Sequence, residues 1–346
     1  MRPSIVIPAY NAARTLQRTL AACKRQRWQG KPVEIVVVDD GSTDRTAKIP
    51  ERAGARCMQQ QNAGPAAARN TGWRAAQGDV ICFTDSDCIP PADWVSRLLT
   101  VLEAEGASGV GGSYDIANPG SVIAACIHDE ITYRHARMSG SVPFLGTFNV
   151  CFRCQALEEI GGFDESFPTA SAEDNDLSYR LTEGGHELVF EPTIKVQHRH
   201  PERLWQFLGQ QFWRAYWRIK LYRKHPHMMR GDRYTNLADA ITVPTFLLLT
   251  GLAPFAWLPC VGWVAGALTL LGLALQLPAA RHALRSGHRA TALVAPGLFF
   301  LRGFAWAWGA VWGLLAFWLH GRRKKFKDRD HSGAREGRGP AGETGR

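Results

Sequence analysis

The first hundred residues alternate short apolar runs with longer amphipathic stretches. Four apolar runs predict β-strands, and two of these are nearly continuous, as is typical of strands that are covered on both faces. In the stretches between them, apolar residues recur at helical spacing, Ser42 and Asp44 suit a helix N-terminus, and Pro65 suits a first helical position. The predicted strands are 4–8, 34–39, 55–59 and 80–84, and the predicted helices are 12–27, 43–53 and 65–76.

Strands that alternate with helices in this way predict an α/β fold with a mostly parallel, Rossmann-like sheet and right-handed crossovers. In such sheets, ligands bind beyond the carboxyl ends of the strands. Asp39 and Asp40 fall at one strand end, and Asp85 and Asp87 fall at another. We therefore expect the functional residues to gather at this edge of the sheet.

Three long apolar segments follow in the last third of the chain. Residues 241–258 and 261–277 carry no charge, and each just reaches the roughly 20 helical residues that cross a bilayer core. The third segment, 292–319, is longer but has Arg302 near its middle. So much Leu, Gly and Trp without a polar face favours membrane helices over buried core helices of a soluble domain.

The charges beside these segments predict their orientation in a membrane. If the first half of the chain is cytoplasmic, a two-helix hairpin returns the basic loop at 281–289 to the cytoplasm, as the positive-inside rule expects. A third full crossing would put the basic run at 322–327 outside, against the same rule. We therefore expect 292–319 to be re-entrant or interfacial, with Arg302 near the headgroups; a crossing that breaks the rule is the alternative.

The formal net charge of +10 lies largely in this last third. Just before the apolar segments, residues 203–224 interleave Arg and Lys with aromatic residues such as Trp205 and Tyr216. Such a pattern can bind single-stranded nucleic acid, but beside membrane segments it favours an interfacial helix on anionic lipid, and we expect no nucleic-acid partner. A helix packed between domains is the alternative for part of it. The predicted organisation is a domain at 1–200, an interfacial helix and linker at 201–235, a membrane region at 241–319 and a basic, disordered tail at 320–346.

The eight cysteines are scattered along the chain. Cys151 and Cys154 form a lone CxxC without a second pair, so a structural zinc site is not expected. A reduced, cytosol-facing domain is the simplest interpretation. No basic stretch and cleavage site precede the apolar run that begins at Ser4, so we expect no signal peptide.

The run FTDSDC (83–88) brings two carboxylates directly after a buried strand. Asp85 and Asp87 face the same way and repel each other unless a positive charge lies between them. A turn or helix cap is one interpretation. The other is a Mg²⁺ or Mn²⁺ site, because such cations take carboxylate oxygens and share their shell with substrate phosphates. The glycine-rich phosphate motifs of dinucleotide-binding and P-loop proteins are absent, and Arg69 is a fixed cation that could meet a nucleotide.

Six motifs in order resemble the family 2 glycosyltransferases of the GT-A fold: SIVIPAYN, EIVVVDDGSTD, NAGPAAARNTG, FTDSDC, GGFDESF and SAEDNDLSYRL. The resemblance covers residues 1–225, and the apolar segments that follow are similar to those of the membrane-bound branches. It implies an inverting, metal-dependent enzyme that moves a sugar from a nucleoside-diphosphate sugar to a hydroxyl of a lipid-linked or membrane-associated acceptor. It also implies a multi-pass protein of the cytoplasmic membrane with its catalytic domain on the cytoplasmic side.

Carried over position by position, the resemblance implies a donor-binding half. The turn of Pro8, Ala9 and Tyr10 would line the pocket for the nucleotide base. Asp40 would accept a hydrogen bond from the base, and Arg69 would lie close to it.

The metal would lie at the edge of this half. Asp85 would lie at the ribose and metal edge, Ser86 would bind the donor, and Asp87 would ligate the Mg²⁺ or Mn²⁺ that bridges the diphosphate. His198 or His200 is either a further metal ligand or a surface histidine at a strand end.

The acceptor half follows from later motifs. Asp174 matches the general base and should begin a helix, whose dipole favours its ionised form; a helix N-cap is the alternative. Glu173 and the glycines of GGF, Gly162 among them, would shape the acceptor side. Gly146 and Asn149 belong to GTFNVCFR (146–153), which matches the strand that family members place under the sugar.

One motif departs from the family's processive synthases, which carry Gln-x-x-Arg-Trp before their membrane channel. Gln211 and Arg214 keep the first two of these residues on the acceptor side, but Ala215 replaces the Trp. We therefore expect transfer of a single sugar. A processive polysaccharide synthase and a catalytically inactive membrane assembly subunit are the alternatives.

Overall fold

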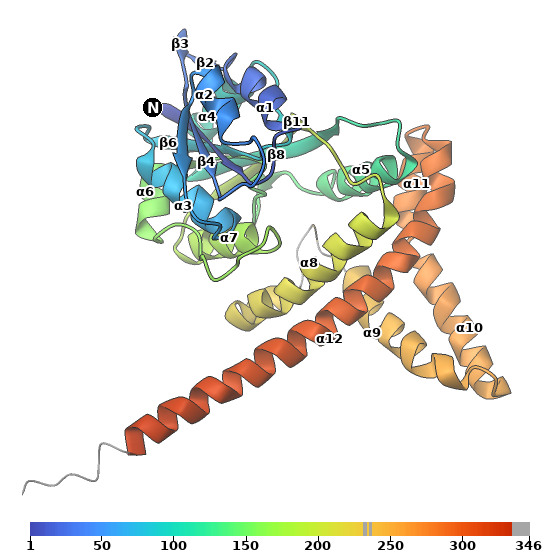
Figure 1. The fold of residues 1–346 in the computed structure, drawn as a ribbon. Coiled ribbons are helices and arrows are strands. Elements are labelled where there is room, and N and C mark those ends of the chain that lie inside the picture. Colours follow the sequence, from blue (N-terminus) through green and yellow to red (C-terminus); the bar gives the residue numbers. More distant parts are fainter. Residues whose placement is uncertain (231–233, 235–236, 334–346) are drawn as a thin grey trace, which may run out of the picture.

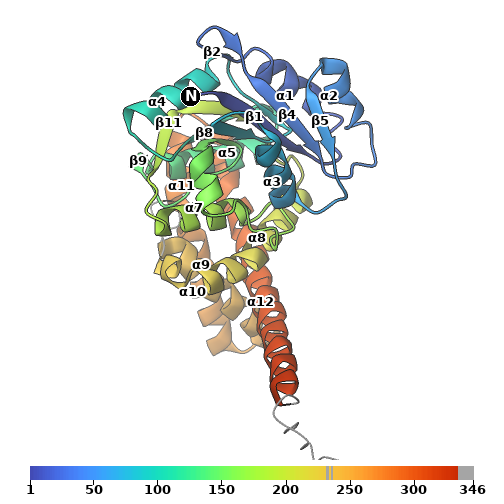
Figure 2. The same cartoon turned by 90° about the vertical axis from the view of Figure 1, so that its left-hand side faces the viewer.

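The computed structural model describes residues 1–230, 234 and 237–333, with residues 230 and 318–333 described by their backbone only. A sheet-based domain stands above a group of long helices (Figures 1 and 2). The domain holds the first two thirds of the chain, and the long helices hold the apolar segments.

All four predicted strands are present. They lie parallel to one another in the order β5-β4-β1-β6. Along β1, Ile5 and Ile7 pack into the core on one face of the sheet and Val6 packs into the core on the other, as the alternation of strand side chains requires. The strands are β1 (Pro3–Ala9), β4 (Glu34–Asp39), β5 (Arg56–Gln59) and β6 (Val80–Thr84).

The helices between these strands are present but begin later than predicted, except the third. They are α1 (Leu16–Cys23), α2 (Lys48–Ala53) and α3 (Pro65–Ala75). Ser42 and Asp44 do not stand at the N-terminus of α2, so this prediction was wrong. Instead, the Asp44 carboxylate accepts hydrogen bonds from the backbone N–H groups of Thr46 (2.9 Å) and Ala13 (3.2 Å) and folds a turn before the helix.

The sheet continues beyond β6 with a change of direction. β10 (Asn149–Arg153) lies antiparallel between β6 and β8 (Gly109–Ile116), which makes the sheet mixed. β11 (Leu188–His198) runs parallel to β8, and the short β7 (Cys88–Ile89) pairs with its end. The remaining short strands are β2 (Arg27–Trp28), β3 (Lys31–Pro32) and β9 (Gly140–Ser141).

Helices cover both faces of the sheet (Figure 1). α1 and α4 (Trp94–Ala104) pack on one face. α3, α6 (Cys154–Glu159) and α7 (Glu173–Glu183) pack on the other. Because α3 and α7 share a face, polar residues at their N-terminal parts lie close to the carboxyl end of β6.

Two further helices connect this domain to the apolar helices. α5 (Val122–His135) follows β8, and α8 (Leu204–Lys224) coincides with the predicted basic and aromatic helix. α8 lies along the later helix α12 (Arg289–Gly333) (Figure 1). At Gly309 and Gly313 of α12, the backbone carbonyls of α8 leave no room for a Cβ atom. Part of α8 is therefore a packed helix, although Trp205 remains 81% exposed.

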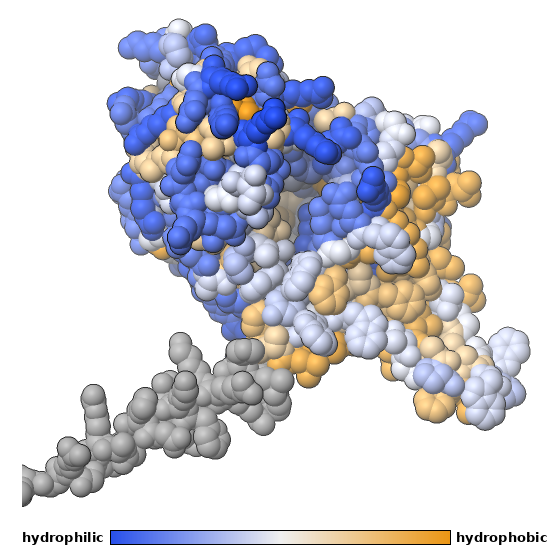
Figure 3. All heavy atoms as spheres, viewed as in Figure 1, coloured by the Kyte–Doolittle hydropathy of each residue, from blue (hydrophilic) through white to orange (hydrophobic). Residues whose placement is uncertain are grey.

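Three helical stretches are long and apolar enough to cross a membrane: 237–255, 259–285 and 289–317. They overlap the three predicted segments. Hydrophobic residues gather over this part of the molecule and hydrophilic residues cover the sheet domain (Figure 3). The helices are α9 (Leu237–Leu252), α10 (Pro259–Ala274), α11 (Leu277–Arg285) and α12, with short 3₁₀ turns at Pro226–Arg230 and Ala253–Phe255.

Of the two forms predicted for the third segment, the re-entrant one was wrong, because α12 runs in one direction from Arg289 to Gly333, and the interfacial one stays a prediction. Arg302 is buried within the protein, where it pairs with Glu130 of α5 and donates to Gln276. Glu130 also pairs with Arg134, and these two cations hold its pKa well below the ordinary value although burial opposes them. Of the predicted disordered tail, residues up to 333 continue α12, and 334–346 lie outside the described residues.

Arg302→Met should destabilise the protein because it leaves the buried Glu130 with a single cation. We expect the free energy of unfolding to fall by about 3 kcal/mol, the low end for breaking a buried ion pair, since Arg134 remains. Thermal unfolding in detergent measures the change, with Arg289→Met at an exposed position of the same helix as the control. Equal stability of the two variants would contradict the pairing.

Candidate active site

The two carboxylates of FTDSDC lie at the end of β6, where they begin a tight turn. The backbone N–H of Cys88 donates to the carbonyl oxygen of Asp85 (3.1 Å), and β7 follows at once. The turn holds the side chains of Asp85 and Asp87 at a fixed edge of the sheet. Each of them meets a different cationic or basic partner.

Arg69 is the partner of Asp85. This arginine comes from α3, is 3% exposed, and donates to Asp85 Oδ1 at 2.8 Å and to Glu173 Oε1 at 2.9 Å. Since a guanidinium presents several N–H groups in a fixed fork, one side chain can hold two carboxylates. Arg69 thereby joins the end of β6 to the first residue of α7.

Asp174 is the second residue of α7. The helix is capped by Ala172, so the alternative that Asp174 is the N-cap does not hold. The Asp174 side chain is half-buried, and Oδ1 accepts a hydrogen bond from the backbone N–H of Asn175 (2.8 Å). Burial and the neighbouring Glu173 raise the pKa of Asp174 to about 6, against the opposite effect of Arg69 and Arg214. A carboxylate with this pKa can accept a proton near neutral pH.

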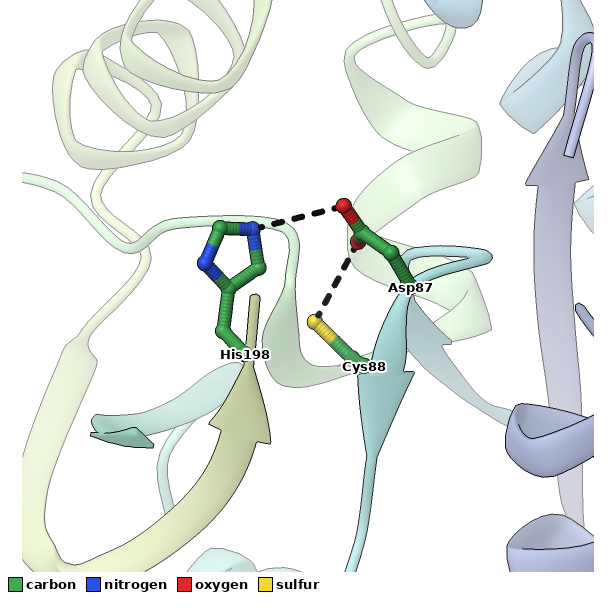
Figure 4. A group of neighbouring side chains, drawn as sticks. All are labelled: Asp87, Cys88 and His198. Carbon is green, nitrogen blue, oxygen red and sulfur yellow. Dashed lines mark hydrogen bonds and ion pairs between the residues drawn. The ribbon is translucent and has the colours of Figure 1, made fainter. Parts of the chain in front are cut away.

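Asp87 forms the second centre, with His198 at the end of β11 and Cys88 of β7 (Figure 4). His198 Nε2 lies 3.6 Å from Asp87 Oδ2, and ligand atoms of the three residues lie within 4.8 Å of one another. Burial raises the pKa of the Cys88 thiol well above its ordinary value, so this sulfur stays protonated and is a poor ligand. The carboxylate and the imidazole remain, and this donor set fits Mn²⁺ or Mg²⁺.

The two candidate histidines therefore differ. His198 faces Asp87, whereas His200 is 3% exposed and its Nδ1 lies 3.2 Å from Nδ1 of His198. Burial lowers the pKa of His200 to about 2, so its ring is neutral. Of the two, only His198 is oriented as a ligand that shares a metal with Asp87.

One cavity of about 1070 Å³ joins these centres. It extends from the end of β1 past Asp87 and Asp174 to the wall formed by α8, and both predicted halves of the site open into it. The predicted residues that line it are Pro8, Ala9, Tyr10, Asp40, Arg69, Asp85, Ser86, Asp87, Gly146, Glu173, Asp174, His198, Gln211 and Arg214.

Asp40 has a further role that the sequence did not indicate. Its carboxylate accepts hydrogen bonds from the backbone N–H groups of Ala63 and Gly64 (2.9 Å each) and from the side-chain amide of Gln60 (2.8 Å). These bonds hold the chain that leads into α3. Asp40 thus positions the helix that carries Arg69.

Two predicted acceptor-side residues belong to the core instead. Asn149 is fully buried: its amide donates to the carbonyl oxygens of Ser113 and Ile194 at 2.9 Å and accepts from Trp94 Nε1 at 2.8 Å. Its hydrogen-bonding groups are used inside the sheet, so the predicted contact with acceptor was wrong.

Gly162 is the second correction. It has a φ of +77°, and a Cβ atom there would collide with the side chains of Asn70 and Trp73. The glycine therefore allows its loop to pack closely on α3, and it is absent from the residues that line the described cavity.

Tyr114 is a cavity residue that the sequence analysis missed. Its ring stacks on Phe148 with the centroids 3.5 Å apart and an interplanar angle of 12°. Both residues line the cavity, and the Tyr114 ring lies beside that of His198, with the centroids 4.9 Å apart. The glycine-rich run before Tyr114 obscured the strand alternation that could have revealed it.

Comparison with known proteins relates the chain to a family of enzymes. Residues 4–161 match the family model of glycosyl transferase family 2. Glycosyltransferase AglE of Haloferax volcanii is 30% identical over 194 residues, which cover 54% of this chain and 63% of the relative. The undecaprenyl-phosphate 4-deoxy-4-formamido-L-arabinose transferase of Pectobacterium carotovorum is 38% identical over 119 residues, which cover 31% and 35%. The chain thus spans less than two thirds of the length of either relative.

Among solved structures, the mannosyltransferase PcManGT from Pyrobaculum calidifontis, in complex with GDP-Man and Mn²⁺, matches with a TM-score of 0.56. The identity is 20%, and the match covers 90% of this chain and 87% of the other. At this identity, the likeness shows the fold, which is GT-A. Residues 4–161 belong to glycosyl transferase family 2, and the resemblance found in the sequence is confirmed over this part of the chain.

Arg69→Met should weaken the whole site because it leaves Asp85 and the buried Glu173 without their cation. We expect the free energy of unfolding to fall by about 3–5 kcal/mol. Arg69→Lys should restore only part of this stability, since one ammonium group cannot reproduce the fork of N–H groups that holds both carboxylates. Urea unfolding in detergent measures both. Arg74→Met, at an exposed position of α3, is the control, and a loss no larger than in this control would contradict the bridge.

Proposed function

We propose that this family 2 glycosyltransferase moves a sugar from a nucleoside-diphosphate sugar to a hydroxyl group of a lipid-linked or membrane-associated acceptor, with inversion at the anomeric carbon. The observation that carries the proposal is the single cavity that contains the Asp87–His198 pair, Asp174 and the wall of α8. Because the proposed donor-binding and acceptor-binding residues line the same cavity, the two substrates can bind next to each other.

The donor half is proposed to lie at the ends of β1 and β6. Asp87 and His198 would hold Mg²⁺ or Mn²⁺, which when bound neutralises charge on the departing diphosphate. Asp85 would face the ribose, with its orientation set by Arg69. Support for a divalent metal comes from the donor atoms themselves and from the Mn²⁺ in the related mannosyltransferase.

The acceptor half is proposed to centre on Asp174. A carboxylate at the start of a helix, with its pKa raised to about 6, is mostly ionised at neutral pH and can take the proton of the attacking hydroxyl. One base opposite one leaving group allows one in-line displacement, which inverts the anomeric carbon. Gln211 and Arg214 on α8 would contact the acceptor from the other side of the cavity.

A membrane acceptor is favoured by what surrounds the site. α8 packs on α12, and three helical stretches nearby are apolar enough to cross a membrane. A relative is named as an undecaprenyl-phosphate sugar transferase. We propose a multi-pass protein of the cytoplasmic membrane with the sheet domain on the cytoplasmic side, where basic residues of α8 would also contact anionic lipid.

A transfer assay tests this function. Detergent-solubilised protein is incubated with a panel of nucleotide sugars and a membrane lipid extract, and nucleoside diphosphate release and glycolipid formation are scored. We expect release from one donor to depend on the lipid, with one sugar added per acceptor, and EDTA to abolish it. Release that does not depend on the lipid would exclude a membrane acceptor, and full activity in metal-free buffer would exclude a metal at Asp87 and His198.

Asp174→Asn preserves shape but removes the group that accepts the proton. Turnover should fall by ~10²-fold or more while donor binding stays unchanged. For the wild type, kcat/KM should fall as the pH drops through about 6, because protonation of Asp174 removes the base. Asp115→Asn, at an exposed position, is the control. Undiminished turnover of Asp174→Asn would remove this residue from the mechanism.

A further inference from the structure

A second cluster of charged residues lies beside Asp174, the proposed base. Asp176 lies two residues after Asp174 on α7 and is completely buried. Arg180, on the same helix, donates from Nε to its Oδ2 at 2.9 Å. Asp176 Oδ1 has two partners at the C-terminal end of α8: Lys224 Nζ at 2.7 Å and His225 Nε2 at 3.0 Å.

His225 lies between two carboxylates. Nε2 faces Asp176 Oδ1, and Nδ1 faces Glu183 Oε1 at 2.7 Å. Each contact is a hydrogen bond only when the nitrogen carries a proton, so the cationic ring makes both. The ring is 3% exposed, and Tyr179 packs against it edge to face, with ring centroids 5.4 Å apart. A buried charge is tolerated when its partners are in place.

The same end of α8 also holds the loop that leads to α7. Lys224 Nζ lies 2.7 Å from Asp164 Oδ2, and Lys220 Nζ lies 2.7 Å from Ser166 Oγ. Burial raises the pKa of Asp164, but Lys224 and the hydrogen bonds from Ser166 together outweigh it and hold the pKa well below the ordinary value. These contacts hold the C-terminal end of α8 against the loop before α7 and against α7 itself, which carries Asp174.

Gln211 and Arg214 lie earlier in α8, closer to its N-terminus, and line the cavity. The Gln211 side chain accepts from Trp306 Nε1 of α12 at 3.0 Å. The middle of α8 is thus held by α12, and its end is held by α7. The width of the acceptor half depends on both attachments.

We propose that Asp176, Glu183, Lys224 and His225 form a clamp, and that His225 is a positioning residue that holds the acceptor wall of α8 at a working distance from Asp174. This inference rests on the proposed function, because the clamp acts on an acceptor-binding wall. It assigns His225 no contact with the reacting atoms.

The test compares His225→Gln with His227→Gln in the full-length, detergent-solubilised protein. His227 contacts the same Glu183 (3.3 Å) but is 55% exposed, so it is a matched control outside the buried cluster. For His225→Gln we expect a higher KM for the lipid acceptor and turnover about 10-fold to 100-fold lower, because misplaced reactants lose rate steeply. The donor KM should not change, and His227→Gln should match the wild type.

Hydrogen–deuterium exchange provides a readout that needs no substrate. Amides of the last turn of α8, including His225 N–H on the Leu221 carbonyl oxygen, should exchange faster in His225→Gln, while β1 and α3 stay protected. If His225→Gln fails to fold, Glu183→Gln at the rim should give a smaller change in the same direction.

Unchanged exchange in α8 would overturn the clamp. Faster exchange with wild-type acceptor kinetics would overturn its positioning role. A wild-type protein that transfers no sugar from any donor would instead overturn the proposed function, and with it the acceptor role of this wall.

Discussion

The structure depends on one buried guanidinium between two carboxylates. Asp85, Asp87, Glu173 and Asp174 bring four acidic groups to one cavity, and an arginine keeps its charge when buried. Arg69 pairs with Asp85 and Glu173, and so it fixes the end of β6 relative to the start of α7. The two carboxylates that it does not touch, Asp87 and Asp174, have raised pKa values, and they are the two to which we assign metal binding and proton transfer in the proposed function.

Sequence reasoning was strongest where local pattern decides structure. Continuous apolar runs gave β4 and β6 with correct bounds, and the carboxylates at the end of β6 followed from the strand. It was weaker where distant segments meet. The Arg69–Glu173 pair joins residues 104 positions apart. Asn149 was placed on the acceptor side because GTFNVCFR (146–153) matches a strand of the resembled family, yet a strand residue faces one side only, and this one faces the core.

Arg302 shows the same limit in the apolar helices. A lone arginine in an apolar segment suggests a position near headgroups, since a charge in hydrocarbon is costly. The charge is instead neutralised by Glu130, whose sequence separation from Arg302 is 172 residues. α5 has no continuous apolar stripe that would have predicted its contact with α12. The Arg302–Glu130 pair therefore links α5 to an apolar helix, although neither residue is distinguishable from an ordinary surface charge in its local sequence.

The same reasoning explains the mixed character of α8. Its basic and aromatic residues suggested an interface with lipid, and its exposed Trp205 is compatible with that. Yet glycines of α12 admit its backbone closely, and buried charges at its end attach it to α7. A helix held on both sides transmits displacement from one to the other, because packed interiors deform little. The α8 wall of the cavity is therefore attached both to an apolar helix and to the helix that carries Asp174, so the geometry of the proposed acceptor half depends on how the apolar helices pack.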